Sequence, residues 1–218
     1  MVARGDGGRT ARLRVMEFAG PSVDNPRMSK GRLEAFSDGV IAILITIMVL
    51  ELKVPQGTSL EALSPLRAIL LSYVLSFVTL GIWWTNHHHL MQATKVVSGR
   101  VLWLNLFLLF WLSLFPFVTA WMGESNFASI PTAVYGVPLL LAGVAYYFLV
   151  RALIAAPGQP PTIAAAIGMD AKGKLSLVAY LLAIAVALVV PLLALAIYAA
   201  VAAAWFIPDR RIERALGR

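Results

Sequence analysis

The chain has 218 residues, of which 60% are hydrophobic and only 13% are charged, whereas a soluble domain carries roughly 25% charged residues. It contains no cysteine, which excludes disulfides, thiolate metal sites and cysteine nucleophiles. A formal net charge of +7 would suit nucleic acid or an anionic membrane, but several uncharged runs approach or exceed the ~20 residues that a membrane-spanning helix needs. The sequence therefore predicts an all-α, multi-pass membrane protein.

The N-terminal part of the chain holds a polar tail and two predicted spans. Residues 1–28 are basic and lack the apolar run of a signal peptide, so we interpret them as a disordered tail. The first span runs from about residue 32 to 52 and ends at the turn-forming segment 53–57. The second runs from about residue 66 to 92.

Two further spans occupy the middle of the chain. The third lies between Arg100 and Glu124, and we expect a kink at Pro116 because proline interrupts the hydrogen bonding of a helix. The fourth begins near Pro131, since proline is favoured in a first helical turn, and ends near Arg151.

The last part of the chain predicts a loop and two short helices. Residues 155–174 contain a cluster of proline and glycine and are interpreted as a cytoplasmic loop that could include a short interfacial helix. No charge occurs from 175 to 207, which is too long for one span and short for two, and Pro191 near the middle favours two helices joined by a tight hairpin. This predicts six transmembrane helices in one domain, residues 29–208, followed by a basic cytoplasmic tail, 209–218.

The distribution of lysine and arginine predicts the orientation. With six spans, 16 of the 18 basic residues fall on the side of the two termini, and only Lys53 and Arg67 fall on the other side. Cytoplasmic segments carry the excess of positive charge, so both termini are predicted to be cytoplasmic in a cell-membrane protein. The same asymmetry explains the net charge without nucleic acid.

The first predicted span has one distinctive line of residues. Each helical residue advances about 100°, which places a basic residue, an aromatic, three aliphatics and a threonine near one line: Arg32, Phe36, Ile43, Thr46, Ile47 and Leu50. Asp38 lies about 140° from Ile43, on the opposite flank. Such a stripe could form a hydrophobic pore constriction, or could simply pack against helices or lipid.

Polar residues gather near the cytoplasmic ends of the second and third spans. His87, His88 and His89 diverge by about 100° each, which disfavours a shared metal site, and we expect no metal or cofactor. One histidine bonded to Asp38, with Asn105 completing the set, would satisfy polar groups that lipid cannot. Tryptophans near the same interface are typical of a membrane-anchoring belt: Trp83, Trp84 and Trp103.

Short motifs occur together in the first three predicted spans: Arg32-x-x-x-Phe36-Ser37-Asp38 with Ile43, Thr46 and Leu50 in the first, Trp84-x-x-His87 in the second, and Asn105 in the third. This combination resembles the transmembrane protein 175 family of endosomal and lysosomal potassium channels and their prokaryotic relatives. The downstream half of the chain matches that family mainly by hydropathy.

The resemblance implies a homotetramer whose first helices line a central pore. It implies that Ile43 is an apolar constriction, that Thr46 is a threonine layer linked to potassium preference, and that Leu50 is a further apolar layer. It also implies that the remaining motif residues tie the first helix to the second and third: Arg32, Phe36, Ser37, Asp38, Trp84, His87 and Asn105.

The function expected is a tetrameric channel that passes K⁺ in preference to Na⁺. The alternative is a proton-coupled transporter or proton leak pathway that uses Asp38 and His87 as a relay, since histidine titrates near neutrality. A non-conducting structural subunit is a third hypothesis. An enzyme is not expected, because no paired carboxylates or metal-ligand spacing occur on the cytoplasmic side.

Overall fold

The computed structural model describes residues 29–159 and 171–206. Its regular structure within those ranges is entirely helical, as predicted. The predicted tails, 1–28 and 209–218, lie outside the described residues, as does the centre of the predicted loop. The helices are α1 (Lys30–Leu50), the 3-10 helix η1 (Leu60–Leu66), α2 (Arg67–Ala93), α3 (Gly99–Ser113), α4 (Phe115–Glu124), α5 (Ser129–Ile154), α7 (Ala171–Ala187) and α8 (Pro191–Phe206).

Within the described residues the predicted plan of six helices is confirmed, with η1 counted together with α2 and with α3 and α4 counted as one broken helix. Four helical segments are long and apolar enough to cross a membrane, namely Lys30–Leu50, Leu60–Ala93, Gly99–Glu124 and Ser129–Ile154. The shorter helices α7 and α8, of 17 and 16 residues, complete the six. The chain is therefore a multi-pass membrane protein.

The third span is broken where a kink was predicted. Helix α3 ends at Ser113, and α4 begins at Phe115 with Pro116 in its first turn. Proline has no backbone N–H to donate to the preceding turn, and its fixed φ suits the start of a helix. The proline therefore turns the expected kink into two helical segments that follow each other closely.

The predicted C-terminal hairpin is also present. Helix α7 ends at Ala187, and α8 begins at Pro191, so only three residues separate the two helices. Helix α7 begins at Ala171 and thus includes four residues that were predicted to belong to the loop, residues 171–174. The boundary predicted at residue 174 was wrong, because it was placed where the uncharged run begins, at Leu175, whereas the first turn of α7 includes two lysines, Lys172 and Lys174.

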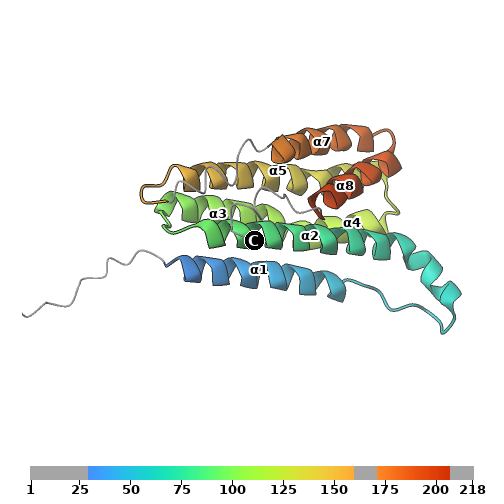
Figure 1. Ribbon diagram of the computed structural model, residues 1–218. Helices are drawn as coiled ribbons and strands as arrows, with labels where there is room; N and C mark the ends of the chain where they lie inside the picture. Colours follow the sequence, from blue (N-terminus) through green and yellow to red (C-terminus); the bar gives the residue numbers. More distant parts are fainter. Residues whose placement is uncertain (1–28, 160–170, 207–218) are drawn as a thin grey trace, which may run out of the picture.

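The helices form an elongated bundle with α1 along one edge (Figure 1). Helix α1 packs against α2, α3 and α4, whereas α5 packs against α3, α4, α7 and α8. Helix α7 lies along the opposite edge (Figure 1). One face of α1 is consequently left without a neighbour from the described part of the chain.

Polar side chains in the bundle interior bond to one another across helices. Thr119 on α4 donates to the hydroxyl of Ser76 on α2 over 2.7 Å, and Ser76 donates to the hydroxyl of Tyr135 on α5 over 3.1 Å. All three side chains are buried. Lipid offers no partner for such groups, so these bonds favour the arrangement of α2, α4 and α5 that satisfies them.

Helices α2 and α4 approach each other closely at Gly123. A Cβ atom at this position would lie 2.8 Å from the Cα atom of Ile69 on α2. We expect Gly123→Ala to lower the free energy of unfolding by about 1–3 kcal/mol, because backbone cannot move aside as a side chain can. Thermal unfolding of the purified protein in detergent checks this.

The matched control is Gly81→Ala on α2. A Cβ atom at this position would meet no other atom within 4 Å. In a helix interior alanine is more stable than glycine by up to about 1 kcal/mol. Gly81→Ala should therefore leave the unfolding midpoint unchanged or raise it. Equal midpoints for wild type and Gly123→Ala would contradict the close approach.

Candidate functional site

Helix α1 has one buried line and one exposed line. The buried line, which faces α2, α3 and α4, consists of Leu33, Ser37, Ile41, Leu44 and Met48. The line on the opposite side contains the predicted pore residues. This division follows the helical period of 3.6 residues, and the exposed side is as apolar as the buried one.

The exposed line, here called the α1 stripe, comprises Ile43, Thr46, Ile47 and Leu50. Ile43 is 56% exposed, Ile47 38% and Leu50 80%, and Thr46 is exposed as well. The hydroxyl of Thr46 donates to the backbone carbonyl of Ile43 over 2.9 Å, so its oxygen still has lone pairs that can accept. The α1 stripe is thus an uncovered apolar surface that carries a single hydroxyl group, that of Thr46.

Arg32 and Phe36 extend the α1 stripe toward the start of the helix. Phe36 is 51% exposed, and Arg32 is exposed too. The resemblance implied that both tie α1 to its neighbours, but Arg32 forms no ion pair with any residue in the described ranges. The helical geometry accounts for this, because both residues lie on the side of α1 that faces away from α2 and α3.

A chain of buried hydrogen bonds joins α1, α2 and α3. Asn105 on α3 donates through Nδ2 to Ser37 Oγ over 2.9 Å, and its Oδ1 lies 2.7 Å from Nε2 of His87 on α2. Ser37 Oγ in turn donates to the carbonyl of Leu33 over 2.9 Å. Ser37, His87 and Asn105 are each at most 1% exposed.

The directions of these bonds follow from one another. Because Ser37 gives its proton to a carbonyl, it must accept from the Asn105 amide nitrogen, which turns the amide oxygen toward His87. His87 must then donate through Nε2–H, so its tautomer is determined by the chain of bonds. Its Nδ1 has no hydrogen-bond partner among the described residues.

Asp38 pairs with a different residue from the one expected. Its Oδ1 accepts a hydrogen bond from Nε1 of Trp84 on α2 over 3.0 Å, and His87 bonds to Asn105 instead. Asp38 follows Ser37 directly and therefore points about 100° away from α3. Trp84, for which a belt position was the alternative, thus holds α1 to α2, whereas Trp103 is 75% exposed.

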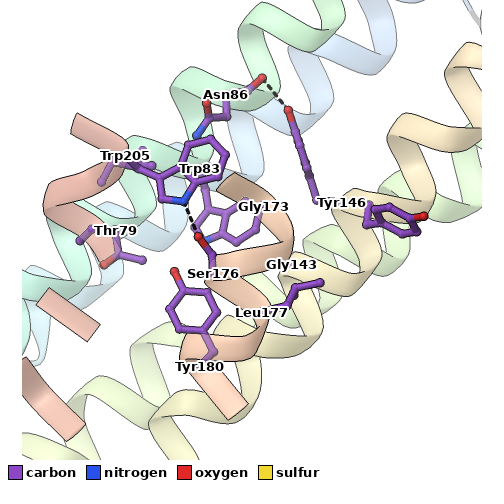
Figure 2. A pocket seen from close by; sticks show the side chains of 13 residues that line it. Thr79, Trp83, Asn86, Gly143, Tyr146, Gly173, Ser176, Leu177, Tyr180 and Trp205 are labelled. Carbon is purple, nitrogen blue, oxygen red and sulfur yellow. Dashed lines mark hydrogen bonds between the residues drawn. The ribbon is translucent and has the colours of Figure 1, made fainter. Parts of the chain in front are cut away.

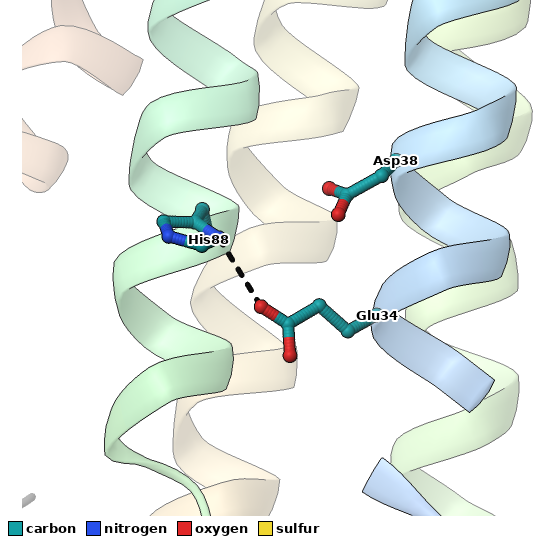
Figure 3. A group of neighbouring side chains, drawn as sticks. All are labelled: Glu34, Asp38 and His88. Carbon is teal, nitrogen blue, oxygen red and sulfur yellow. Dashed lines mark ion pairs between the residues drawn. The ribbon is translucent and has the colours of Figure 1, made fainter. Parts of the chain in front are cut away.

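The three consecutive histidines have three different surroundings. His87 is buried beside α3, His89 is exposed, and His88 faces α1. His88 Nδ1 lies 3.1 Å from Oε1 of Glu34, and Asp38 lies beside them (Figure 3). The sequence analysis missed this group, although the spacing of Glu34 and Asp38 by four residues places both on one helix face.

A separate pocket lies between α2, α5, α7 and α8. It encloses about 50 Å³ and is lined mainly by apolar and aromatic side chains (Figure 2). Two hydrogen bonds join residues that line the pocket. Tyr146 donates to the carbonyl of Asn86 over 3.2 Å, and Trp205 Nε1 donates to the hydroxyl of Ser176 over 2.9 Å. Helix α1 contributes no lining residue, so this pocket lies apart from the α1 stripe.

Comparison with known proteins gives consistent results for the sequence and the fold. Residues 32–116 match the family described as "Endosomal/lysosomal potassium channel TMEM175". A protein from Chryseobacterium sp. (strain P1-3), named a potassium channel, is 50% identical over 189 residues, which cover 87% of this chain and 98% of that one. A crystal structure described as a lysosomal potassium-selective channel TMEM175 homolog from Chamaesiphon minutus has a TM-score of 0.70 and 27% identity, covering 82% of this chain and 96% of that chain.

Animal relatives match a smaller part of the chain and carry a different name. The human protein, named an endosomal/lysosomal proton channel, is 37% identical over 87 residues. That region is 33% of this chain and only 17% of the human protein.

The buried hydrogen-bond chain yields a prediction for Asn105. We expect Asn105→Leu to lower the free energy of unfolding by about 2 kcal/mol or more, because it leaves the His87 N–H without an acceptor and the Ser37 oxygen without a donor. Thermal unfolding in detergent measures the change. Ser113→Ala on the same helix removes an exposed hydroxyl bonded only to its own helix, and should cost less than about 0.5 kcal/mol; similar losses for both variants would contradict the role given to Asn105.

Proposed function

The chain belongs to the TMEM175 family, whose members are ion channels and not enzymes, and on that premise we propose that it is a potassium-permeable channel that passes K⁺ in preference to Na⁺. The observation that carries this proposal is the α1 stripe, an exposed apolar surface interrupted by one threonine. The names of the bacterial relatives, potassium channel and potassium-selective channel, support the choice of ion. The permeant ion is the expected small-molecule partner, and no cofactor takes part in permeation.

The proposed pore is formed by four copies of α1. A single helix cannot enclose a path for ions, so the stripe must meet copies of itself around a closed ring. The uncovered face of α1 at the edge of the bundle supports this arrangement (Figure 1). The number four comes from the family resemblance, because each chain carries one six-helix unit.

The proposed constriction is the ring of Ile43 side chains. An apolar ring excludes water when narrow, so it acts as a hydrophobic gate. Ions that pass it must lose part of their hydration, which costs more free energy for the smaller Na⁺ than for K⁺. Leu50 supplies a second apolar ring seven residues further, two turns along the same face.

Thr46 supplies the proposed potassium preference. Its hydroxyl donates to the Ile43 carbonyl, so in a ring of four copies its lone pairs are available to an ion. Hydroxyl oxygens are neutral ligands that replace some water of hydration without binding the ion so tightly that it cannot leave.

The buried bonds of α1 are proposed to hold the pore helix in place. Ser37 and Asp38 connect α1 to Asn105 on α3 and Trp84 on α2, respectively. These residues are therefore assigned a positioning role and not a place in the permeation path. We further propose a location in the cell membrane with both termini cytoplasmic, which the basic-residue distribution supports.

A proton pathway is the second candidate function. The names of the animal relatives favour it, although the matched region is a small part of those proteins. In this chain Asp38 bonds to Trp84 and His87 bonds to Asn105, so a relay between Asp38 and His87 would require these bonds to rearrange.

Ion flux into proteoliposomes that hold the purified protein tests these alternatives. K⁺, Na⁺ and proton fluxes are recorded in parallel, with protein-free liposomes as the baseline. The channel proposal expects K⁺ flux above Na⁺ flux without a proton requirement. Proton flux that is abolished by His87→Gln would favour the relay, and no flux of any ion would favour a non-conducting subunit.

Replacement of Ile43 tests the constriction. We expect Ile43→Asn to raise K⁺ conductance at least several-fold and to lower the K⁺/Na⁺ permeability ratio, because a ring of polar side chains keeps the constriction filled with water. Single-channel recording or flux measures both. Ile130→Asn introduces the same change at an exposed apolar position on α5 and should leave both the conductance and the permeability ratio unchanged. An unaltered current in Ile43→Asn would exclude Ile43 as the constriction of the pore.

Replacement of Thr46 separates selectivity from gating. We expect Thr46→Val, which keeps the shape of the side chain but removes the hydroxyl, to lower the K⁺/Na⁺ permeability ratio toward 1. Thr46→Ser keeps the hydroxyl and should preserve most of the ratio. Reversal potentials under bi-ionic conditions measure it, and an unchanged ratio in Thr46→Val would rule out the threonine layer as its source.

A further inference from the structure

We propose that Glu34, Asp38 and His88 form a binding site for a divalent transition-metal ion, with Zn²⁺ as the best-fitting example, between α1 and α2. Glu34 and Asp38 lie one turn apart on α1, and their carboxylates point toward the imidazole of His88 on α2 (Figure 3). One ligand atom from each residue lies within 4.8 Å of the other two. The distance from His88 Nδ1 to Glu34 Oε1 is 3.1 Å.

These distances suit a shared metal ion. Zinc binds imidazole nitrogen and carboxylate oxygen at about 2.0–2.2 Å in tetrahedral geometry, so two ligands of one ion lie about 3.4 Å apart. The 3.1 Å between His88 Nδ1 and Glu34 Oε1 is already close to this value, and ligand atoms within 4.8 Å of one another need to close by about 1.4 Å at most. The side chains of His88 and Glu34 are 33% and 22% exposed, so they have room to adjust, and water can fill the remaining coordination positions.

The charge of the group also fits a dication. Within residues 29–159 and 171–206, neither carboxylate forms an ion pair with lysine or arginine, and the one ion-pair partner is His88, with Glu34. Two carboxylates on a membrane-spanning helix are costly unless their charge is compensated. A protonated His88 supplies one positive charge, whereas a divalent ion beside a neutral imidazole supplies two.

Neighbouring side chains already orient two of the three ligands. Trp84 donates to Asp38 Oδ1 over 3.0 Å, so Oδ2 remains able to ligate, and its ring stacks on that of His88 with centroids 5.7 Å apart and planes at 19°. The side-chain amide nitrogen of Gln92 lies 2.8 Å from His88 Nε2, so in the metal-free structure Gln92 donates this hydrogen bond. With Nδ1 on the metal, Nε2 would carry the proton, and the Gln92 amide would have to turn over so that its oxygen accepts, as is usual around metal-bound histidines.

The ligand set determines the class of metal. Two carboxylates and one imidazole, without thiolate, suit Zn²⁺ and Co²⁺. Ca²⁺ requires six to eight oxygen ligands, and Mg²⁺ prefers water and oxygen in octahedral geometry, so neither is expected to compete. A bound ion would connect α1 directly to α2 on the flank of α1 that lies away from the α1 stripe.

Metal titration of the purified, tag-free and chelator-treated protein tests the site. Isothermal titration calorimetry should show saturable binding of one Zn²⁺ per chain. Co²⁺ should give visible ligand-field absorption bands that disappear when Zn²⁺ is added. The absence of saturable binding by the wild type would overturn the proposal.

Single substitutions then locate the site. We expect Glu34→Gln and His88→Gln each to raise the Kd for Zn²⁺ at least tenfold. His89→Gln is the matched control, because it removes the adjacent, exposed histidine and should leave the Kd unchanged. Zn²⁺ should also raise the Tm of wild type and His89→Gln, but not that of His88→Gln.

Two results would contradict the assignment of Glu34 and His88 as metal ligands. A Kd in both Glu34→Gln and His88→Gln equal to that of wild type would refute the assignment, as would an equal loss of affinity in His89→Gln. Size-exclusion elution at the wild-type volume confirms that each variant is folded. These measurements record binding and not permeation, so their outcome is independent of the proposed channel function.

Discussion

The burial of polar side chains beside α1 is the constraint on which the candidate site depends. Ser37 must find hydrogen-bond partners inside the bundle because lipid offers none, and Asn105 and the Leu33 carbonyl supply them. These bonds and the burial of the apolar residues on the same line of α1 favour one rotation of the helix about its own axis. Thr46 follows Ser37 by nine residues and therefore lies about 180° away from it, which directs the α1 stripe out of the bundle.

Adjacent residues in the motifs make different contacts, because successive side chains on a helix point about 100° apart and so face different neighbouring helices. Ser37 reaches α3, and Asp38, one residue later, reaches Trp84 on α2. On α2, His87 is buried beside Asn105, whereas His88 meets Glu34 across the interface with α1. Neighbouring polar residues of the sequence thus form two separate groups in the structure. The hydrogen bonds of Ser37, Asn105 and His87 are buried, whereas the group of Glu34, Asp38 and His88 is partly exposed.

Helix α1 accordingly has three functional sides. Its buried line fixes its position, its flank toward α2 carries the carboxylates of the proposed metal site, and its outer line carries the α1 stripe. The stripe and the carboxylates are kept apart by the helical period, so the apolar surface proposed to line a pore holds no acidic side chain. That separation is consistent with a constriction that acts through dehydration and not through fixed charge.

Much of the fold could be predicted from the sequence because the membrane imposes simple rules. The length of apolar runs located the spans to within a few residues, and proline located the break before α4 and the hairpin before α8. The helical period alone placed Ile43, Thr46 and Leu50 on one line of α1 and Asp38 on another. These features depend on local chain geometry and on the solvent that surrounds each segment, both of which are written in the order of residues.

Only the tertiary structure decided which residues meet across helices. The sequence suggested a hydrogen bond from a histidine to Asp38. In the structure, the packing of α2 and α3 brings His87 into hydrogen-bond contact with Asn105, and Asp38 accepts a hydrogen bond from Trp84. The meeting of Glu34, Asp38 and His88 was missed for the same reason. The period of one helix follows from its own sequence, whereas the rotation and depth of two helices relative to each other depend on the best packing of all six.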